Sequence, residues 1–494
     1  PQHVYFRAHN LLTSGDGTPA LKWGSTGVYS EDASGNPRYD WTILDEIFDA
    51  YLAAGVRPYV QIGFMPRDLS TKPDPYQHQW HPGLRYEEIF TGWAYPPKDY
   101  AKWGELAYQW AKHCRERYGL EEVESWYWQT WNEANAGYWQ GTPEEFCKLH
   151  DYAVDGVRRA IPRARVGGPD TAGPGGDFTY RFRDHCVSGT NHATGEVGTP
   201  LDFVSFHAKG SPRFVEGRVQ MGIAAHLQEI ERGFRIVASH PAVRSLPIVI
   251  GESDPEGCAA CQGPQFGYRN GTMYSSYTAA SFARKWDLAR KYEVNLEGAL
   301  TWAFEFEGHP LFAGFRSLAT GGIDKPVLGV FRMFSRMSGE RVAATSDHAV
   351  PLGEIVAHGV RRGADVGALA TRDAGKLCVM VWHYHDDDLP GDDAAVMLTL
   401  EKLSADAVRR SRVRHYRIDR RHSNAYAAWQ AMGSPAEQHE AQLAELRQAA
   451  DLAEVADGGA LEPQGDGAVL RFDLPRQGVS LLVVEWEEEG ATGG

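Results

Sequence analysis

Two glutamates in this sequence follow strand-like segments, where the side chains of a barrel enzyme can reach a substrate. Glu133 follows the aromatic run YWQTW in the segment WNEAN, and Glu252 follows the apolar run IVIG. Hydrolysis of a glycosidic bond needs one carboxylic acid near the leaving oxygen and a second carboxylate across the sugar ring. The two motifs therefore predict glycoside hydrolysis, with Glu133 as general acid/base and Glu252 as nucleophile.

The segments around these motifs alternate between strand and helix patterns. The β-rich runs are 3–9, 58–64, 125–131, 164–168, 201–207, 246–251 and 296–304. Between them, Gly119 stops one helix, and Thr142 with Glu145 forms a capping box that starts another. This alternation predicts an α/β fold, a (β/α)₈ TIM barrel with its catalytic groups at the C-terminal ends of the strands.

The runs number seven, and the first begins almost at residue 1. We therefore expect that the first of the eight barrel strands is missing from this chain. On that count Glu133 follows strand four and Glu252 follows strand seven.

The pattern changes after residue 337 to short strands separated by Gly and Asp turns, such as 377–385, 396–400 and 479–484. A helical stretch from about 435 to 453 interrupts them. A single core rarely grows beyond about 300 residues. We therefore expect a catalytic barrel over 1–337 and an accessory β-sandwich over 338–494.

Composition excludes some partners. The chain carries 50 Lys and Arg against 65 Asp and Glu, a formal net charge of −15, which repels a phosphate backbone. No apolar run approaches the roughly 18 residues of a membrane span. We expect neither a nucleic-acid nor a membrane partner.

The cysteines and the start of the chain bear on location. Six cysteines and no visible signal peptide favour the cytoplasm, with a periplasmic or secreted location as the alternative. Cys258 and Cys261 have CxxC spacing but no second pair that would complete a zinc site, so a structural loop pair, free or bridged, is expected.

Several longer motifs resemble glycoside hydrolase family 39 of clan A, which holds β-xylosidases and α-L-iduronidases. They are YWQTWNEAN (127–135), FHAKG (206–210), IGESDPEG (250–257), KPVLGVFRMFSRMSGERV (325–342) and HYRIDRRHSNAYAAW (415–429). The resemblance covers nearly the whole chain. It implies a retaining double displacement on an oligosaccharide, with no metal or organic cofactor. The two carboxyl groups would then lie about 5 to 5.5 Å apart.

Further residues at or just past the predicted strand ends are expected to bind the substrate. They are His9, Phe64, Asn132, His207, Lys209, Trp302 and Glu305. Asn132 could hold the sugar 2-hydroxyl, and the resemblance implies a sugar contact for His9 and an aromatic platform for Trp302. The alternatives are core packing for the aromatic rings and solvent exposure for Glu305.

Three functions remain open at this point. The first is an exo-acting β-D-xylosidase that releases xylose from the non-reducing end of xylo-oligosaccharides. The second is an α-L-iduronidase-like or other family 39 glycosidase, in which Lys209 would pair with the carboxylate of a uronic acid. The third is a carbohydrate-binding protein that keeps the cleft but not turnover.

Overall fold

The computed structural model describes residues 4–18, 25–78, 81, 84–455 and 460–486. Its N-terminal part contains a curled sheet of seven parallel strands in the order β1-β4-β5-β6-β7-β10-β11. Their bounds are β1 Tyr5–Ala8, β4 Arg57–Ile62, β5 Tyr127–Thr130, β6 Arg165–Thr171, β7 Phe203–Lys209, β10 Pro247–Asp254 and β11 Asn295–Ala299. The predicted count of seven strands is confirmed. His3, at the start of the first predicted run, lies outside the described residues.

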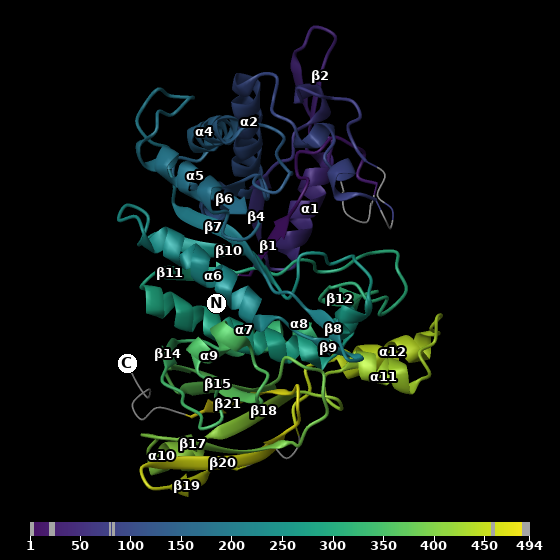
Figure 1. The fold of residues 1–494 in the computed structure, drawn as a ribbon, viewed down its shortest axis with the longest axis vertical. Helices are drawn as coiled ribbons and strands as arrows, with labels where there is room; N and C mark the ends of the chain where they lie inside the picture. Colours follow the sequence, from purple (N-terminus) through teal and green to yellow (C-terminus); the bar gives the residue numbers. More distant parts are fainter. Residues whose placement is uncertain (1–3, 19–24, 79–80, 82–83, 456–459, 487–494) are drawn as a thin grey trace.

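Helices pack on the outer face of this sheet (Figure 1). They are α1 Thr42–Ala53, α2 Tyr100–Tyr118, α3 Leu120–Glu124, α4 Pro143–Ala160, α5 Asp177–Ser188, α6 Ile223–Ala238, α7 Thr272–Tyr292 and α8 Pro326–Arg336. The capping box of Thr142 and Glu145 starts α4, and α2 ends at Gly119 with a φ of 87°. Both predicted helix boundaries are confirmed.

Short elements fill the loops between these helices and strands. Three hairpins pair β2 Tyr29–Glu31 with β3 Pro37–Tyr39, β8 Arg213–Val215 with β9 Arg218–Gln220, and β12 Ala319–Thr320 with β13 Ile323–Asp324. Short 3₁₀ helices span Arg67–Leu69, Tyr86–Ile89, Gly92–Ala94 and Pro264–Asn270.

The concave side of the parallel sheet is filled by large side chains. Tyr59, Tyr127, Phe203 and Val249 form one buried cluster, against which Tyr5 and Leu300 pack. Side chains from the two edges of the sheet, β1 and the end of β11, thus reach the same cluster. Because side chains alternate along a strand, the residues two and four positions beyond Tyr5 also face inward.

The C-terminal part contains two antiparallel sheets, ordered β14-β15-β16-β21-β18 and β17-β20-β19. Their bounds are β14 Glu340–Val342, β15 Asp365–Asp373, β16 Lys376–Tyr384, β17 Ala394–Leu400, β18 Arg412–Ile418, β19 Glu462–Gln464, β20 Gly467–Leu474 and β21 Val479–Glu485. Short helices α9 Leu352–His358 and α10 Ala405–Arg410 flank them.

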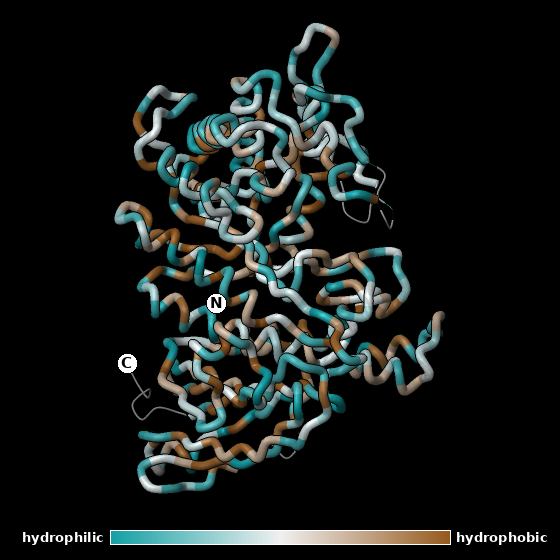
Figure 2. The backbone as a smooth tube through the Cα atoms, in the orientation of Figure 1, coloured by the Kyte–Doolittle hydropathy of each residue, from teal (hydrophilic) through white to brown (hydrophobic). Residues whose placement is uncertain are grey.

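The five-stranded sheet has an apolar partner on each face. One face shares a buried cluster with the smaller sheet, through residues such as Val381 and Leu470. The other face joins the core of α6, α7 and α8, so that Trp382 packs in the same cluster as Tyr277 and Val330. Hydrophobic stretches accordingly run through both the central strands and the C-terminal sheets (Figure 2). The predicted β-sandwich and its boundary at residue 337 stay predictions.

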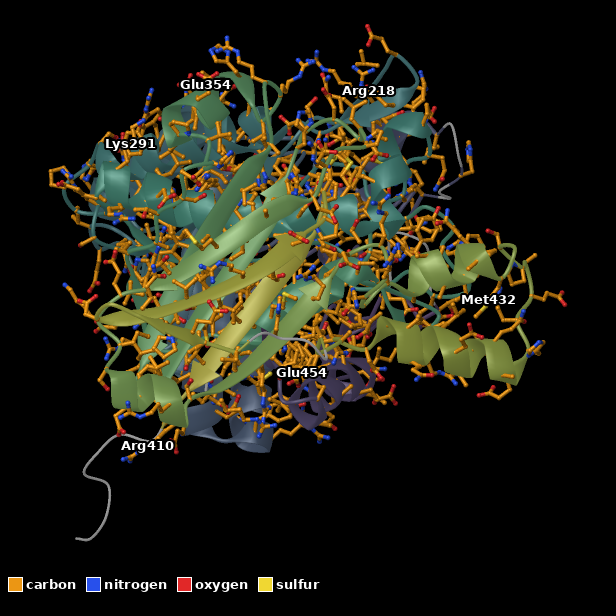
Figure 3. All side chains as sticks on the ribbon, turned by 90° about the horizontal axis from the view of Figure 1, so that it is seen from below. Arg218, Lys291, Glu354, Arg410, Met432 and Glu454 are labelled. Atoms are coloured by element: carbon orange, nitrogen blue, oxygen red, sulfur yellow. A yellow bond between two sulfur atoms is a disulfide. The ribbon has the colours of Figure 1, made fainter. Side chains whose placement is uncertain are left out.

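A helical hairpin projects from the C-terminal part (Figures 1 and 3). It consists of α11 Ala425–Ala431 and α12 Glu440–Ala450, of which only α12 lies in the predicted helical stretch. The hairpin shares a small apolar cluster with Phe312, in the loop after β11, and with Ile323 of β13. It therefore supports the loops at the end of the parallel sheet.

The structure shows the state of the cysteines and the length of the apolar helices. Cys258 and Cys261 form a disulfide. The four remaining cysteines, Cys114, Cys147, Cys186 and Cys378, are buried and free. Within the described ranges, no helix is both long and apolar enough to cross a membrane.

Candidate functional site

The carboxylates of Glu133 and Glu252 meet at the C-terminal end of the curled sheet. Glu133 lies just beyond β5, where its own φ is 46° and its N–H donates to the Asp170 carbonyl at 2.9 Å. Glu252 lies in β10, where the register with β7 shifts between Ile250 and Glu252. One carboxylate oxygen of each glutamate and a ring nitrogen of His207 all lie within 4.8 Å of one another. The structure thus brings the two predicted carboxylates into one site.

Basic side chains surround Glu252. Lys209 Nζ donates to its Oε2 at 2.7 Å, and Arg7 Nη1 donates to its Oε1 at 3.1 Å. His9 Nε2 also lies 3.1 Å from Oε1. Burial alone would raise the pKa of Glu252, but Lys209, His207 and His9 outweigh it and hold this pKa well below its usual value. Glu252 is therefore ionised, the form that a nucleophile needs.

His207 connects Glu133 to a buried aspartate. Its Nδ1 lies 2.7 Å from Glu133 Oε1, and its Nε2 lies 2.9 Å from Asp170 Oδ2. Burial opposes a charge on this ring, yet the carboxylates of Glu252, Asp170 and Glu133 prevail and raise the pKa of His207 to about 10. As an imidazolium, His207 donates a hydrogen bond from each ring nitrogen, one to Glu133 and one to Asp170.

Arg7 and Asp170 belong to this site but were not predicted. The Arg7 side chain is 3% exposed; its Nη2 donates to Asn132 Oδ1 at 2.6 Å and also to Asp170. Arg7 could have been predicted, because it lies two residues after Tyr5 and two before His9, on the inward-facing side of β1 and of the residue that follows it. Asp170 had a weaker signal, since β6 extends through it to Thr171, beyond the predicted run 164–168.

A second unpredicted aspartate, Asp254, links Lys209 to the end of β11. Lys209 Nζ donates to Asp254 Oδ2 at 2.5 Å, and the Thr301 hydroxyl and the Trp302 N–H donate to Asp254 Oδ1 at 2.6 and 3.1 Å. The Trp302 N–H is therefore bonded to a side chain and is not available for backbone pairing with β10. Backbone pairing with β10 continues only to Leu300, so β11 ends at Ala299 and the predicted extension to residue 304 is wrong.

Most of the other predicted substrate residues lie close to the two carboxylates. The Trp302 ring is half-buried and stands at 84° to the His9 ring, with 5.9 Å between their centroids. Phe64 is fully buried behind His9 and packs on Trp93 and Trp131, so a direct sugar contact would require this packing to open. Glu305 instead accepts a hydrogen bond from the Gly322 N–H in the β12–β13 turn.

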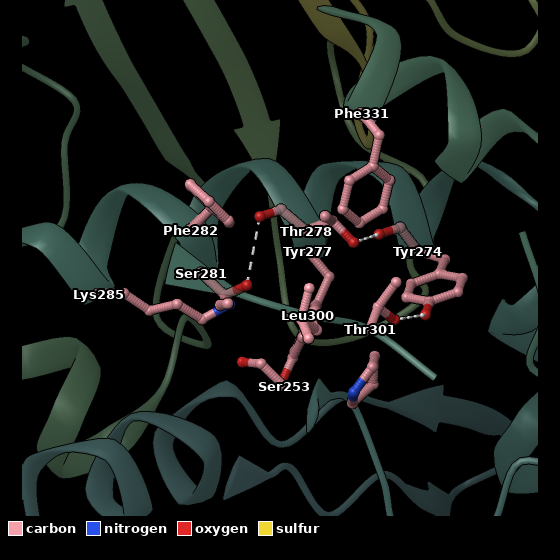
Figure 4. Close-up of a pocket in the computed structure, with 12 residues that line it drawn as sticks. Ser253, Tyr274, Tyr277, Thr278, Ser281, Phe282, Lys285, Leu300, Thr301 and Phe331 are labelled. Atoms are coloured by element: carbon pink, nitrogen blue, oxygen red, sulfur yellow. Dashed lines mark hydrogen bonds between the residues drawn. The ribbon is translucent and has the colours of Figure 1, made fainter. Parts of the chain in front are cut away.

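Behind β10, away from the carboxylates, a cavity of about 20 Å³ is lined by residues of α7, β10 and the end of β11 (Figure 4). That volume suits a single water molecule. Lys285 of α7 reaches this cavity and is 4% exposed. Burial lowers the pKa of Lys285 to about 7, against a smaller opposing effect of Asp254.

We expect Lys285→Met to stabilise the protein in a pH-dependent way. A lysine in the unfolded chain titrates near 10.4. Between pH 7 and about pH 10 the unfolded chain therefore carries a proton on this lysine that the native state has lost. The free energy of unfolding of the wild type rises with pH over this range. The variant should gain roughly 1–4 kcal/mol in free energy of unfolding at pH 6, and less at pH 9. Urea denaturation at both pH values measures this, with Lys291→Met, half-exposed on the same helix, as control. An equal gain at the two pH values would contradict the prediction.

The sequence and the fold of this chain are similar to those of known glycosidases. The family model of glycosyl hydrolases family 39 matches residues 19–465. A β-xylosidase of Geobacillus stearothermophilus is 24% identical over 443 residues, which are 87% of this chain and 77% of that protein. An α-L-iduronidase of Mus musculus is 26% identical over 427 residues, 80% of this chain and 61% of that protein. The crystal structure of a monomeric β-xylosidase from Caulobacter crescentus matches with a TM-score of 0.72 at 23% identity, covering 98% of this chain and 90% of that one.

Proposed function

The chain belongs to glycosyl hydrolases family 39, and from that premise we propose that it is a retaining exo-glycosidase that releases xylose from the non-reducing end of xylo-oligosaccharides. The observation that carries this proposal is the approach of the carboxylate oxygens of Glu133 and Glu252 to within 4.8 Å. Retaining enzymes hold their two carboxyl groups about 5 to 5.5 Å apart, whereas inverting enzymes need roughly 6.5 to 9.5 Å to admit a water. The observed separation supports the retaining mechanism.

In the first step Glu252 attacks the anomeric carbon while Glu133 protonates the leaving oxygen. Glu252 enters this step ionised, because Lys209, His207 and His9 hold its pKa well below its usual value. The C–O bond to the leaving group breaks as the glycosyl ester of Glu252 forms. In the second step Glu133 takes a proton from water, which displaces Glu252 and returns both carboxyl groups to their starting forms. His207 holds Glu133 in place through both steps.

The preference for xylose rests on the charges around the sugar. A β-D-xyloside and an α-L-iduronide have the same ring configuration and differ by one carboxylate on C5. Arg7 donates to both Asp170 and Glu252, and Lys209 to both Glu252 and Asp254. Both of these cations are therefore already paired with carboxylates, which favours a sugar without a carboxylate.

An α-L-iduronidase-like activity is the second candidate. It is favoured by the mouse α-L-iduronidase, which is 26% identical to this chain over 427 residues, against 24% over 443 residues for the Geobacillus β-xylosidase. Lys209 is the residue that would turn toward a uronate carboxylate, at the expense of its bond to Asp254.

Hydrolysis of matched aryl glycosides tests both candidates. We expect the 4-nitrophenyl β-D-xyloside to be cleaved with a higher kcat/KM than the corresponding α-L-iduronide, and proton NMR to show the β-anomer of xylose as the first product. A faster reaction with the iduronide would select the second candidate. An α-anomer as first product would refute the retaining mechanism, and xylose binding without turnover would identify a carbohydrate-binding protein.

We expect Asp170→Asn to reduce kcat roughly 100-fold and to move the alkaline limb of kcat/KM to lower pH. Asp170 helps to hold the proton on His207, and removing its charge makes that proton easier to lose. Rate profiles from pH 4 to 10 measure both effects. The control is Asp184→Asn, an exposed residue of α5 that pairs with Arg183. An alkaline limb at its original pH would show that Asp170 does not act through His207.

A further inference from the structure

A second group of ionisable side chains lies on α4, α5 and the loop that follows α5. Asp151 of α4 is fully buried, His185 of α5 is partly exposed, and His192 of the loop is exposed. One carboxylate oxygen and one ring nitrogen from each histidine all lie within 4.8 Å of one another. The proposed glycosidase mechanism uses none of these residues.

The geometry of the group suits a cation. His185 Nε2 lies 2.9 Å from Asp151 Oδ1 and 3.0 Å from Oδ2, so it faces both oxygens of the carboxylate. Two ligand atoms of a tetrahedral zinc, each about 2.1 Å from the metal, are separated by about 3.4 Å, so His185 and Asp151 need to part by only about 0.5 Å for an ion to replace the proton between them. The His192 ring stacks beside His185, at 13° and with 5.7 Å between centroids, and its nitrogen completes the group from the solvent side.

The surroundings hold Asp151 in a position that can bind a metal. The Thr199 hydroxyl donates to its Oδ1 at 2.5 Å, and the His192 N–H donates to its Oδ2 at 2.8 Å. These bonds orient the carboxylate without the help of an ion, as outer partners of metal ligands do. The ligands are therefore already in position in the folded protein, and the exposed His192 leaves a path for an ion to enter.

The donor types select the kind of ion. Two imidazoles and one carboxylate suit zinc and its neighbours among the divalent transition metals, whereas calcium and magnesium prefer an all-oxygen set. Cys147 and Cys186 lie on the same two helices, but neither sulfur belongs to the group of ligand atoms that lie within 4.8 Å of one another.

We propose that Asp151, His185 and His192 form a Zn²⁺ site, separate from the two glutamates, with one coordination position open to water. The ion ties the loop between Gly189 and Thr199 to α4 and α5. The loop is also held by a bridge between Thr190 and Val197, by the Thr199 N–H, which donates to the Cys186 carbonyl of α5 at 2.9 Å, and by the bonds to Asp151. Because Val197 is 78% exposed, the ion would fix a segment that faces solvent.

Calorimetric titration of the chelator-treated full chain with zinc sulfate tests the proposal. We expect one ion per chain at this site, a higher melting temperature with zinc, and binding at least about 100-fold weaker in both His192→Ala and His185→Gln. His192 is exposed, so His192→Ala should match the metal-free wild type in melting temperature and keep its glycosidase activity.

The matched control is His113→Ala. His113 pairs with Asp45 at 2.7 Å on other helices, and in the described ranges it belongs to no three-ligand group. Its zinc binding should equal that of the wild type. Glu133, His207 and Glu252 form another such group, and an ion bound there would remain in His192→Ala and would inhibit hydrolysis. Zinc binding that is absent in the wild type, or unchanged in His192→Ala, would overturn the proposal.

Discussion

Glu252→Ala is expected to lower kcat on aryl xylosides by about 10⁵-fold, because no covalent intermediate can form without the carboxylate. The fold should persist, although Lys209 and Arg7 each lose one of their anionic partners. Added azide should restore part of the activity, since a small anion fits the space of the lost side chain. The anion attacks from the face that Glu252 occupied, so the product should be the α-glycosyl azide, which NMR identifies.

The control for this variant is Glu231→Ala on α6. Glu231 is also a buried, ion-paired glutamate, with Lys291 as its partner, but it lies outside the site. It should lose stability and keep its kcat. Full activity of Glu252→Ala, or an azide product of β-configuration, would remove Glu252 from the role of nucleophile.

The sequence was sufficient to locate the two carboxylates because each follows a strand with a clear pattern. YWQTW and IVIG are apolar or aromatic runs that end in a polar motif, and parallel strands place their C-terminal ends on one side of the sheet. The curled sheet then brings Glu133 and Glu252 together without any local signal for the contact. Strand order and direction thus carried this part of the prediction.

The charge network could not be predicted in the same way, because it depends on distances between residues far apart in the chain. Asp170 shows this most clearly: a Cβ at Gly251 would lie 2.1 Å from Asp170 Oδ1, so only glycine admits the aspartate beside β10. The motif IVIGE reads as an ordinary strand end, and nothing in it names Asp170 as the neighbour. Polar pairing inside a curled sheet is a tertiary property.

Element boundaries were missed where side chains compete with backbone pairing. Asp254 accepts the Trp302 N–H just beyond β11, and Asn424 caps α11 by accepting from the Ala427 N–H. Asn424 is a typical helix-capping residue, so its position before the AYAAW segment was the available signal for this short helix. The Asp254 contact had no such signal, because it joins residues 48 positions apart.

Glu133→Ala is expected to affect substrates according to their leaving group. An alkyl or sugar leaving group must be protonated as it departs, so kcat/KM on xylobiose should fall by about 10³-fold. A 2,4-dinitrophenyl group leaves without a proton, so its glycosyl enzyme still forms and then accumulates, because no base activates water. Both kcat and KM should therefore fall on the dinitrophenyl xyloside, with kcat/KM little changed. Azide should restore turnover and give the β-glycosyl azide, since it attacks the intermediate without a base.

The comparison between the two leaving groups decides the role of Glu133. In Glu145→Ala, the control, a glutamate of the α4 capping box is removed at some cost in stability, and both substrates should react as with the wild type. Equal losses on xylobiose and on the dinitrophenyl xyloside would mean that Glu133 only shapes the site. A loss confined to the poor leaving group, together with retention in the azide product, would identify Glu133, which His207 holds in place, as the general acid/base.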